Sequence, residues 1–127
     1  QSLIDASWGD NGPGWRLALL DSVETLRGLE RPAESGLKVA FAALTGDVDP
    51  AYELRAFTPT FEDPVTGSAN GAMAQWLRSR GDVPERYAVS QGTAMGRNGR
   101  VEIADDGNDI WVGGAVGVRV RGQIVVD

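Results

Sequence analysis

Short apolar runs separated by turn residues recur along the chain, and they predict strands more often than helices. Over Leu37–Leu44 the run is continuous, so periodicity leaves a helix open as the alternative. The expected strands are Trp15–Leu20, Leu37–Leu44, Glu53–Thr58, Arg86–Gln91, Ala94–Arg97, Arg100–Ala104, Asp109–Val112, Val116–Arg121 and Ile124–Val126.

Turn residues mark the connections between these runs. Gly9–Gly14 is a turn-rich stretch before the first expected strand. Asn98-Gly99 is the dipeptide typical of a type I′ turn and predicts a two-residue hairpin. Asp106-Gly107 and Arg121-Gly122 predict further breaks between strands.

Two helices are expected. Asp21-Ser22-Val23-Glu24 has the pattern of a capping box and opens a short helix to about Leu29. The longer helix begins after Thr66 or Ser68, either of which can cap it, and ends before Gly81 at the C′ position. Its apolar stripe, at helical spacing, comprises Ala69, Ala72, Met73, Trp76 and Leu77. Trp76 and Trp111 are expected to pack in the core.

These elements predict one α+β domain over residues 1–127, with a mixed or antiparallel sheet curled against the longer helix. The composition is that of a soluble globular protein, with 42% hydrophobic and 24% charged residues. The formal charge is −6 and the 12 basic residues do not cluster, which argues against a nucleic-acid partner. No apolar run is long enough for a membrane span. No signal peptide is evident, so we expect a cytoplasmic protein.

The chain contains no cysteine and no histidine. Disulfides, thiolate nucleophiles and sulfur-ligated metals are therefore excluded. The usual general base and the commonest transition-metal ligand are absent too, and we expect no metal site. Any proton transfer by this chain alone must use Asp, Glu, Lys, Tyr or bound water. The chain does not start with methionine, which suggests trimming or a piece of something longer.

The segment Glu62–Gly71 runs from a loop into the longer helix and is the expected functional centre. Gly67 allows a close backbone approach, and the residues after it open the helix, so several N–H groups lack intrahelical acceptors. Those donors and the helix dipole predict a site for a carboxylate or phosphate. Ser68 adds a hydroxyl, and Asp63 is a candidate acid/base. A merely capped helix with Asp and Ser near its start is the alternative.

This segment also carries a family resemblance. Residues 62–77 read "EDPVTGSANGAMAQWL", which resembles the signature of the PhzF-like isomerases of phenazine biosynthesis, a group with the diaminopimelate-epimerase fold. Weaker matches follow in the family's order along nearly the whole chain: "DNGPGW" at 10–15, "LRAFTP" at 54–59, "QGTAMGR" at 91–97 and "VGGAVGV" at 112–118.

The resemblance covers the family's C-terminal domain only. It implies one half of a two-domain protein with its active site in the cleft, no cofactor, and proton shifts on a small carboxylate-bearing metabolite. Asp63 matches the family's acidic residue and Ser68 its active-site serine. The backbone of Gly67, Ser68 and Ala69 matches the anion hole, while Asn11 and Gly12 match a substrate-lining turn.

Two departures limit what this chain can do alone. The family's principal catalytic Glu lies in an N-terminal domain that this sequence lacks, and Asn70 stands where many members have His. We therefore expect an inactive half-site that needs the missing domain or another chain. The alternatives are a non-catalytic module that binds small carboxylates, and an assembly domain. An exposed former interface also predicts self-association, for example as a homodimer.

Overall fold

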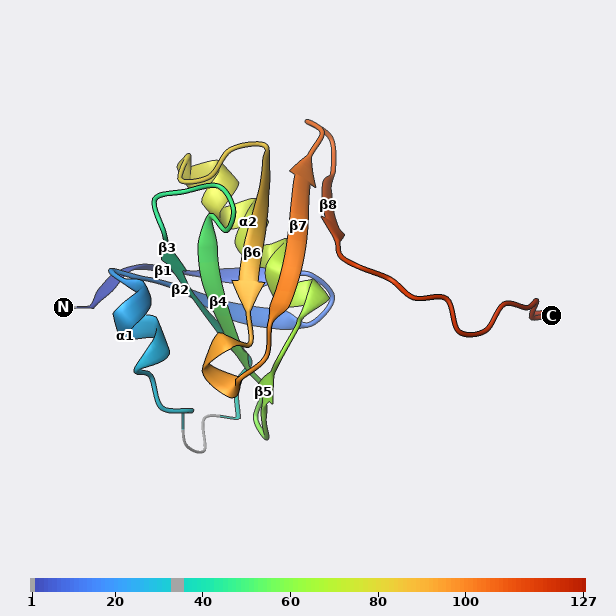
Figure 1. Ribbon diagram of the computed structural model, residues 1–127, viewed down its shortest axis with the longest axis horizontal. Helices are drawn as coiled ribbons and strands as arrows, with labels where there is room; N and C mark the ends of the chain where they lie inside the picture. Colours follow the sequence, from blue (N-terminus) through green and yellow to red (C-terminus); the bar gives the residue numbers. More distant parts are fainter. Residues whose placement is uncertain (1, 33–35) are drawn as a thin grey trace.

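One sheet curls around helix α2 in the computed structural model, which describes residues 2–32 and 36–127 (Figure 1). The strand order is β1-β2-β3-β4-β6-β7-β8, and β5 pairs with β4 beside this path. The strands are β1 (Leu3–Asp10), β2 (Gly14–Leu20), β3 (Val39–Leu44), β4 (Tyr52–Phe57), β5 (Glu62–Asp63), β6 (Arg86–Gln91), β7 (Gly99–Asp105) and β8 (Ile110–Gly113). The helices are α1 (Val23–Arg27), α2 (Gly67–Arg80) and the 3₁₀ turn η1 (Thr93–Met95).

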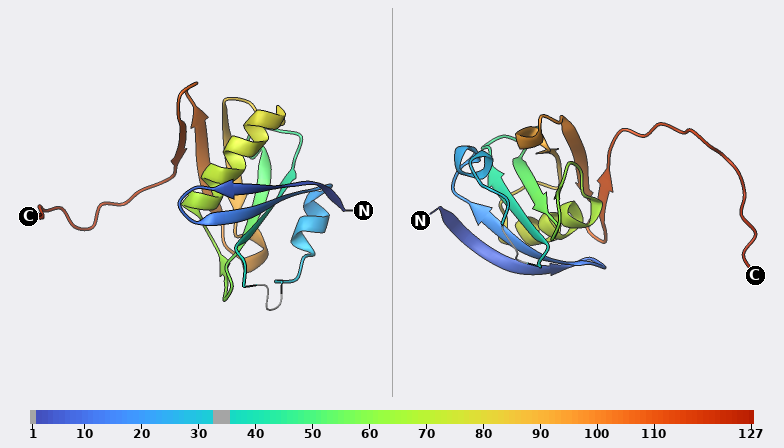
Figure 2. Two further views of the ribbon diagram at one scale, coloured as in Figure 1. Left: turned by 180° about the vertical axis from the view of Figure 1, so that it is seen from behind. Right: turned by 90° about the horizontal axis from the view of Figure 1, so that it is seen from below.

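The sheet is mixed, because two of its pairs are parallel. β2 pairs with β3 and β4 with β6 in parallel, and each of these crossovers contains a helix, α1 or α2. The remaining neighbours are antiparallel. Seen from below, the sheet wraps around α2 (Figure 2). The predicted α+β class with a curled mixed sheet is confirmed.

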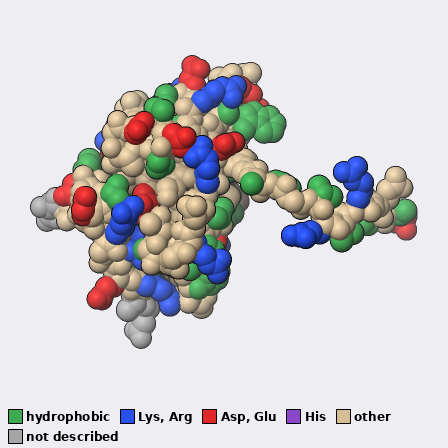
Figure 3. Space-filling view, in the orientation of Figure 1, with side chains coloured by type: hydrophobic (Ala, Val, Ile, Leu, Met, Phe, Trp, Pro, Cys, Tyr) green, Lys and Arg blue, Asp and Glu red, His purple; other side chains and the backbone are tan. Residues whose placement is uncertain are grey.

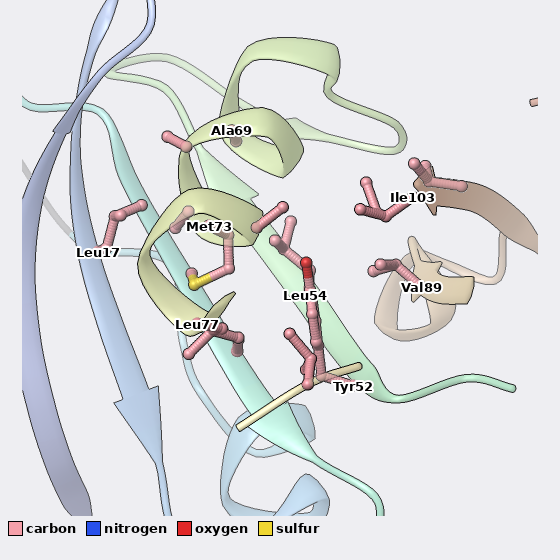
Figure 4. Packing of buried hydrophobic residues seen from close by; sticks show 14 of the residues in the cluster. Leu17, Tyr52, Leu54, Ala69, Met73, Leu77, Val89 and Ile103 are labelled. Carbon is pink, nitrogen blue, oxygen red and sulfur yellow. The ribbon is translucent and has the colours of Figure 1, made fainter. Parts of the chain in front are cut away.

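The core lies between α2 and the inner face of the sheet (Figure 4). Met73 and Leu77 of α2 are fully buried and pack with Leu17 of β2 and Leu54 of β4. The predicted stripe is confirmed except at Trp76, which is only half-buried at the edge of the core. The helix ends as expected at a left-handed glycine, Gly81, with φ 83°.

The start of α1 differs from the prediction by one residue. Ser22 is the N-cap, and its Oγ accepts a hydrogen bond from the Thr25 N–H at 3.1 Å. Asp21 lies outside the helix and accepts the Thr25 hydroxyl at 2.9 Å. The helix ends at Arg27 rather than near Leu29.

Several strand predictions are wrong. Ala94–Arg97 contains the end of η1 and a turn, because Gly92 and Gly96 have φ of 85° and 72° and bend the chain out of the sheet. Asn98-Gly99 does not form a two-residue hairpin. Gln91 pairs with Gly99, so residues 92–98 connect β6 to β7. The strands β1 and β5 were not predicted.

The β7–β8 turn at Asp106-Gly107 is confirmed, and it positions an exposed tryptophan. The Asp106 carboxylate accepts the Asp109 N–H at 2.7 Å, the Trp111 Nε1–H at 2.9 Å and the Asn108 N–H at 2.9 Å. These bonds, that from Asp109 foremost, lower the pKa of Asp106 to about 2. Trp111 is 61% exposed, so its predicted place in the core is wrong.

Residues 114–127 leave the body as an extended tail (Figures 1 and 3). The strands predicted at Val116–Arg121 and Ile124–Val126 do not form. Residues 114–127 have extended backbone without strand pairing, and none of the described strands lies beside them in the sheet. Its alternating valines stay in solvent, with Val116 86% and Val120 88% exposed. Separately, none of the helices in the described ranges is long and apolar enough to cross a membrane.

Candidate functional site

The loop between β5 and α2 places Asp63 close to the start of the helix. β5 pairs with β4, Asp63 opposite Ala56, and the chain then turns through Pro64. The Asp63 Oδ1 accepts the Val65 N–H at 3.2 Å, which closes the turn. The half-buried Asp63 thus ends β5, four residues before the first residue of α2.

The first turn of α2 offers free backbone donors. Gly67, Ser68 and Ala69 are its first three residues, and their N–H groups have no acceptor among the described residues. Asn70 is the first to bond within the helix, to the Thr66 carbonyl at 3.2 Å. Gly67 also lines a cavity of about 860 Å³. The helix start can therefore accept an anion, favoured further by the helix dipole.

Ser68 is bonded to two residues of the β1–β2 hairpin. Its Oγ accepts the indole N–H of Trp15 at 3.0 Å, and its carbonyl accepts Asn11 Nδ2 at 3.2 Å. Trp15 is 2% exposed, so this bond is anchored in the core. With the Ser68 Oγ accepting from Trp15, the hydroxyl proton remains available to a ligand.

Of the two predicted turn residues, only Asn11 touches the helix. A Cβ at Gly71 of α2 would lie 2.5 Å from Asn11 Nδ2, so glycine there admits this contact. Asn11 also lines a second cavity, of about 500 Å³, rather than the one beside Gly67. Gly12 has φ 84° at the tip of the turn, with nothing within 4 Å of the position of a Cβ. A substrate-lining role for this pair stays a prediction.

A buried ion pair holds β5 in place. Arg55 of β4 bonds both carboxylate oxygens of Glu62, at 2.8 and 3.0 Å, and the two side chains are 8% and 13% exposed. The same guanidinium donates to the carbonyls of Leu26 and Leu29 at the end of α1, at 3.0 and 2.8 Å. Glu62 therefore turns towards Arg55 and supports its neighbour Asp63 through the backbone.

Sequence reasoning missed two supporting residues. Gln91 and Asn70 lie beneath the loop, both fully buried, and bond to each other and to Thr66. Gln91 was noted only as the last residue of the expected strand Arg86–Gln91 and as the first letter of "QGTAMGR". A glutamine at the end of a predicted strand was the only signal in the sequence, and its partners Asp63, Thr66 and Asn70 lie more than 20 residues away along the chain.

Gly99 lets the β6–β7 connection approach the same loop, and we expect Gly99→Ala to disturb it. The new Cβ would lie 2.6 Å from the Gln91 carbonyl, 2.8 Å from Val65 Cγ2 and 3.0 Å from the Pro64 carbonyl. Two of these are backbone atoms, so we expect a loss of about 1–3 kcal/mol in unfolding free energy, measured with urea. Gly113→Ala, whose Cβ would meet only the Glu102 carbonyl at 3.9 Å, is the control. Equal losses in both variants contradict the close approach.

Comparison with known proteins bears on the family and the fold of the chain. The model of a family described as "Phenazine biosynthesis-like protein" matches residues 4–126. The uncharacterized isomerase YfhB of Bacillus subtilis is 36% identical over 70 residues, which are 54% of this chain and 22% of that protein. The uncharacterized isomerase YddE of Escherichia coli K12 is 42% identical over 57 residues, 39% of this chain and 19% of that protein. The matches span about a fifth of each relative.

Two solved structures share the fold. The PhzF-family phenazine biosynthesis protein of Bacillus anthracis superposes with a TM-score of 0.63 at 20% identity, covering 80% of this chain and 41% of that one. A phenazine biosynthesis PhzC/PhzF protein of Clostridium difficile gives 0.55 at 24% identity, covering 84% and 40%. This chain thus corresponds to about two fifths of either structure.

Proposed function

The chain belongs to the phenazine biosynthesis-like family, and we propose that it is the C-terminal domain of a cofactor-independent isomerase. In this proposal the enzyme moves a proton on a small carboxylate-bearing substrate. The free N–H groups of Gly67, Ser68 and Ala69 bind the substrate carboxylate. Asp63 exchanges a proton with a carbon atom of the substrate.

The observation that carries the proposal is the pairing of unoccupied helix-start donors with a carboxylate on the adjoining loop. Each charge-assisted hydrogen bond to the substrate is worth about 1.5–3 kcal/mol. In this proposal Asp63 serves the site from a turn closed by its own bond to Val65, so the turn forms without a ligand. Anion binding and proton transfer are thereby assigned to different groups.

The chain supplies one half of such a site. It spans about a fifth of the curated relatives that it matches and two fifths of the solved structures. The family resemblance places the principal catalytic Glu in another domain, and we assign that group to the remaining part of a longer protein or to another chain. A module that only binds carboxylates is the second candidate, favoured because the donors at α2 are complete within this chain.

Titration of the ¹⁵N-labelled chain with acetate tests the binding step. We expect saturable shifts confined to the amides of Gly67, Ser68 and Ala69, with an affinity on the order of 1 mM, since about 4 kcal/mol corresponds to that value. Neutral acetamide is the ligand control and should leave these amides unchanged. Equal shifts with both compounds contradict the anion site, and turnover by this chain alone contradicts the need for a second half.

Gly67→Pro sharpens the same experiment. Gly67 is the first helical residue, where proline is tolerated, and Thr66 has φ −128° and ψ 114°, the extended conformation that favours a following proline. The substitution therefore removes one N–H donor and keeps the helix. A loss of about 1.4 kcal/mol weakens acetate binding about tenfold. Unchanged affinity in a folded variant removes Gly67 from the site.

A further inference from the structure

We propose that Gln91 is the positioning residue of this site, and that it keeps the helix-start amides free by holding the hydroxyl that would otherwise cap them. The inference rests on the proposed anion-binding function and concerns a residue with no direct contact to the ligand. Gln91 ends β6 and is fully buried beneath the loop.

The Gln91 amide bonds both sides of the β5–α2 loop. Its Nε2 donates to the Asp63 carbonyl at 2.8 Å and to Thr66 Oγ1 at 3.0 Å. Its Oε1 accepts the Thr66 N–H at 3.2 Å and Asn70 Nδ2 at 2.9 Å. Both donors and both acceptor positions are thus occupied, and one side chain fixes the backbone of Asp63 relative to the first turn of α2.

The contact with Thr66 Oγ1 has a specific effect on the helix start. Thr66 is the N-cap residue, and a threonine at that position ordinarily accepts an N–H of the first turn through its hydroxyl oxygen. Here the Thr66 side chain caps no N–H, and its Oγ1 instead accepts from Gln91 Nε2, a bond that holds the hydroxyl turned towards Gln91 and away from the first turn. The amides of the first turn therefore stay available to an external anion.

Asn70 belongs to the same network and shows how its amide is oriented. Its Nδ2 donates to the Thr66 carbonyl at 2.7 Å and to Gln91 Oε1. Its Oδ1 is the one buried side-chain polar atom of the described ranges that lacks a partner. Such an atom costs free energy, so the Asn70 amide is oriented for Thr66 and Gln91 rather than for its own complete bonding.

Gln91→Met tests the proposal, since methionine fills the space and makes no hydrogen bond. We expect the released Thr66 hydroxyl to cap the first turn. Hydrogen exchange at Ser68 and Ala69 should then slow, and acetate affinity, read from their amide shifts, should fall about tenfold. Adding Thr66→Val removes the competing hydroxyl and should restore fast exchange and most of the affinity. A purely structural loss would not be reversed by a second substitution.

The control is Tyr52→Phe, which removes a buried hydrogen bond to Tyr87 at 3.1 Å and should change neither reading. The proposal is overturned if Gln91→Met has the acetate affinity and the amide exchange rates of the wild type. It is also overturned if the double variant recovers neither. If Gln91→Met does not fold, Thr66→Val alone decides: faster exchange at Ser68 or Ala69 would mean that Thr66 already caps them. If the wild type does not bind acetate, the proposed function is wrong. The exchange rates at Ser68 and Ala69 still test whether Gln91 keeps the Thr66 hydroxyl away from these amides.

Discussion

If the longer protein is the isomerase proposed above, replacing Asp63 by asparagine is expected to slow its proton transfer about 10²–10⁴-fold, the usual contribution of a positioned acid/base. Asparagine retains the Oδ1 that accepts the Val65 N–H, so the loop should keep its shape. It cannot take up a proton at that oxygen. The measurement is deuterium incorporation from solvent into a carboxylate substrate, followed by mass spectrometry.

Asp47→Asn provides the matched control for this result. Asp47 lies in the β3–β4 loop and likewise accepts a backbone N–H, that of Val48 at 2.7 Å. We expect its replacement to leave deuterium incorporation unchanged. If the folded Asp63→Asn enzyme incorporates deuterium at the wild-type rate, Asp63 only closes the turn and is no acid/base. The chain would then be better described as a module that binds carboxylates.

Arg55→Met should cause the largest loss of stability, about 3–5 kcal/mol in unfolding free energy. The reason is that Glu62, 13% exposed, would retain a buried charge without its partner. The carbonyls of Leu26 and Leu29 would also lose their hydrogen bonds from this guanidinium. Urea unfolding followed by tryptophan fluorescence measures the change. Adding Glu62→Gln removes the unpaired charge and should recover part of it.

Arg100→Met is the comparison, because Arg100 pairs with Asp49 in solvent, where the two side chains are 54% and 59% exposed. Solvent screening makes such a pair weak, so we expect little change. Losses of equal size in Arg55→Met and Arg100→Met would show that burial of the Arg55–Glu62 pair contributes nothing. Loss of activity together with stability in Arg55→Met would be consistent with Glu62 supporting Asp63.

Local patterns predicted the parts of the fold that local forces determine. The stripe and end of α2 could be predicted because both signals lie within the helix and its cap. β1 was missed because its residues are alternately half-buried and exposed on an edge strand, without a continuous apolar run. The Ala94–Arg97 prediction failed because the left-handed Gly92 and Gly96 outweigh strand propensity.

In the candidate site, too, local features could be predicted and long-range contacts could not. The order of Asp63, Gly67 and Ser68 along the chain indicated a loop entering a helix, and the structure has that arrangement. The supporting contacts could not be predicted, since Trp15 is 53 residues from Ser68 and Gln91 is 28 residues from Asp63. No spacing rule connects positions so far apart, and only the curled sheet brings them together.

The contact of the β1–β2 turn with α2 has a thermodynamic consequence. Asn11 bonds the carbonyl of Ser68 at 3.2 Å, while the N–H of the same residue belongs to the proposed anion site. A ligand that binds only when the first turn of α2 is correctly formed also stabilises every contact that this turn requires. Occupancy of the site is therefore linked to the attachment of the edge hairpin, and we expect a bound anion to slow the detachment of this hairpin from α2.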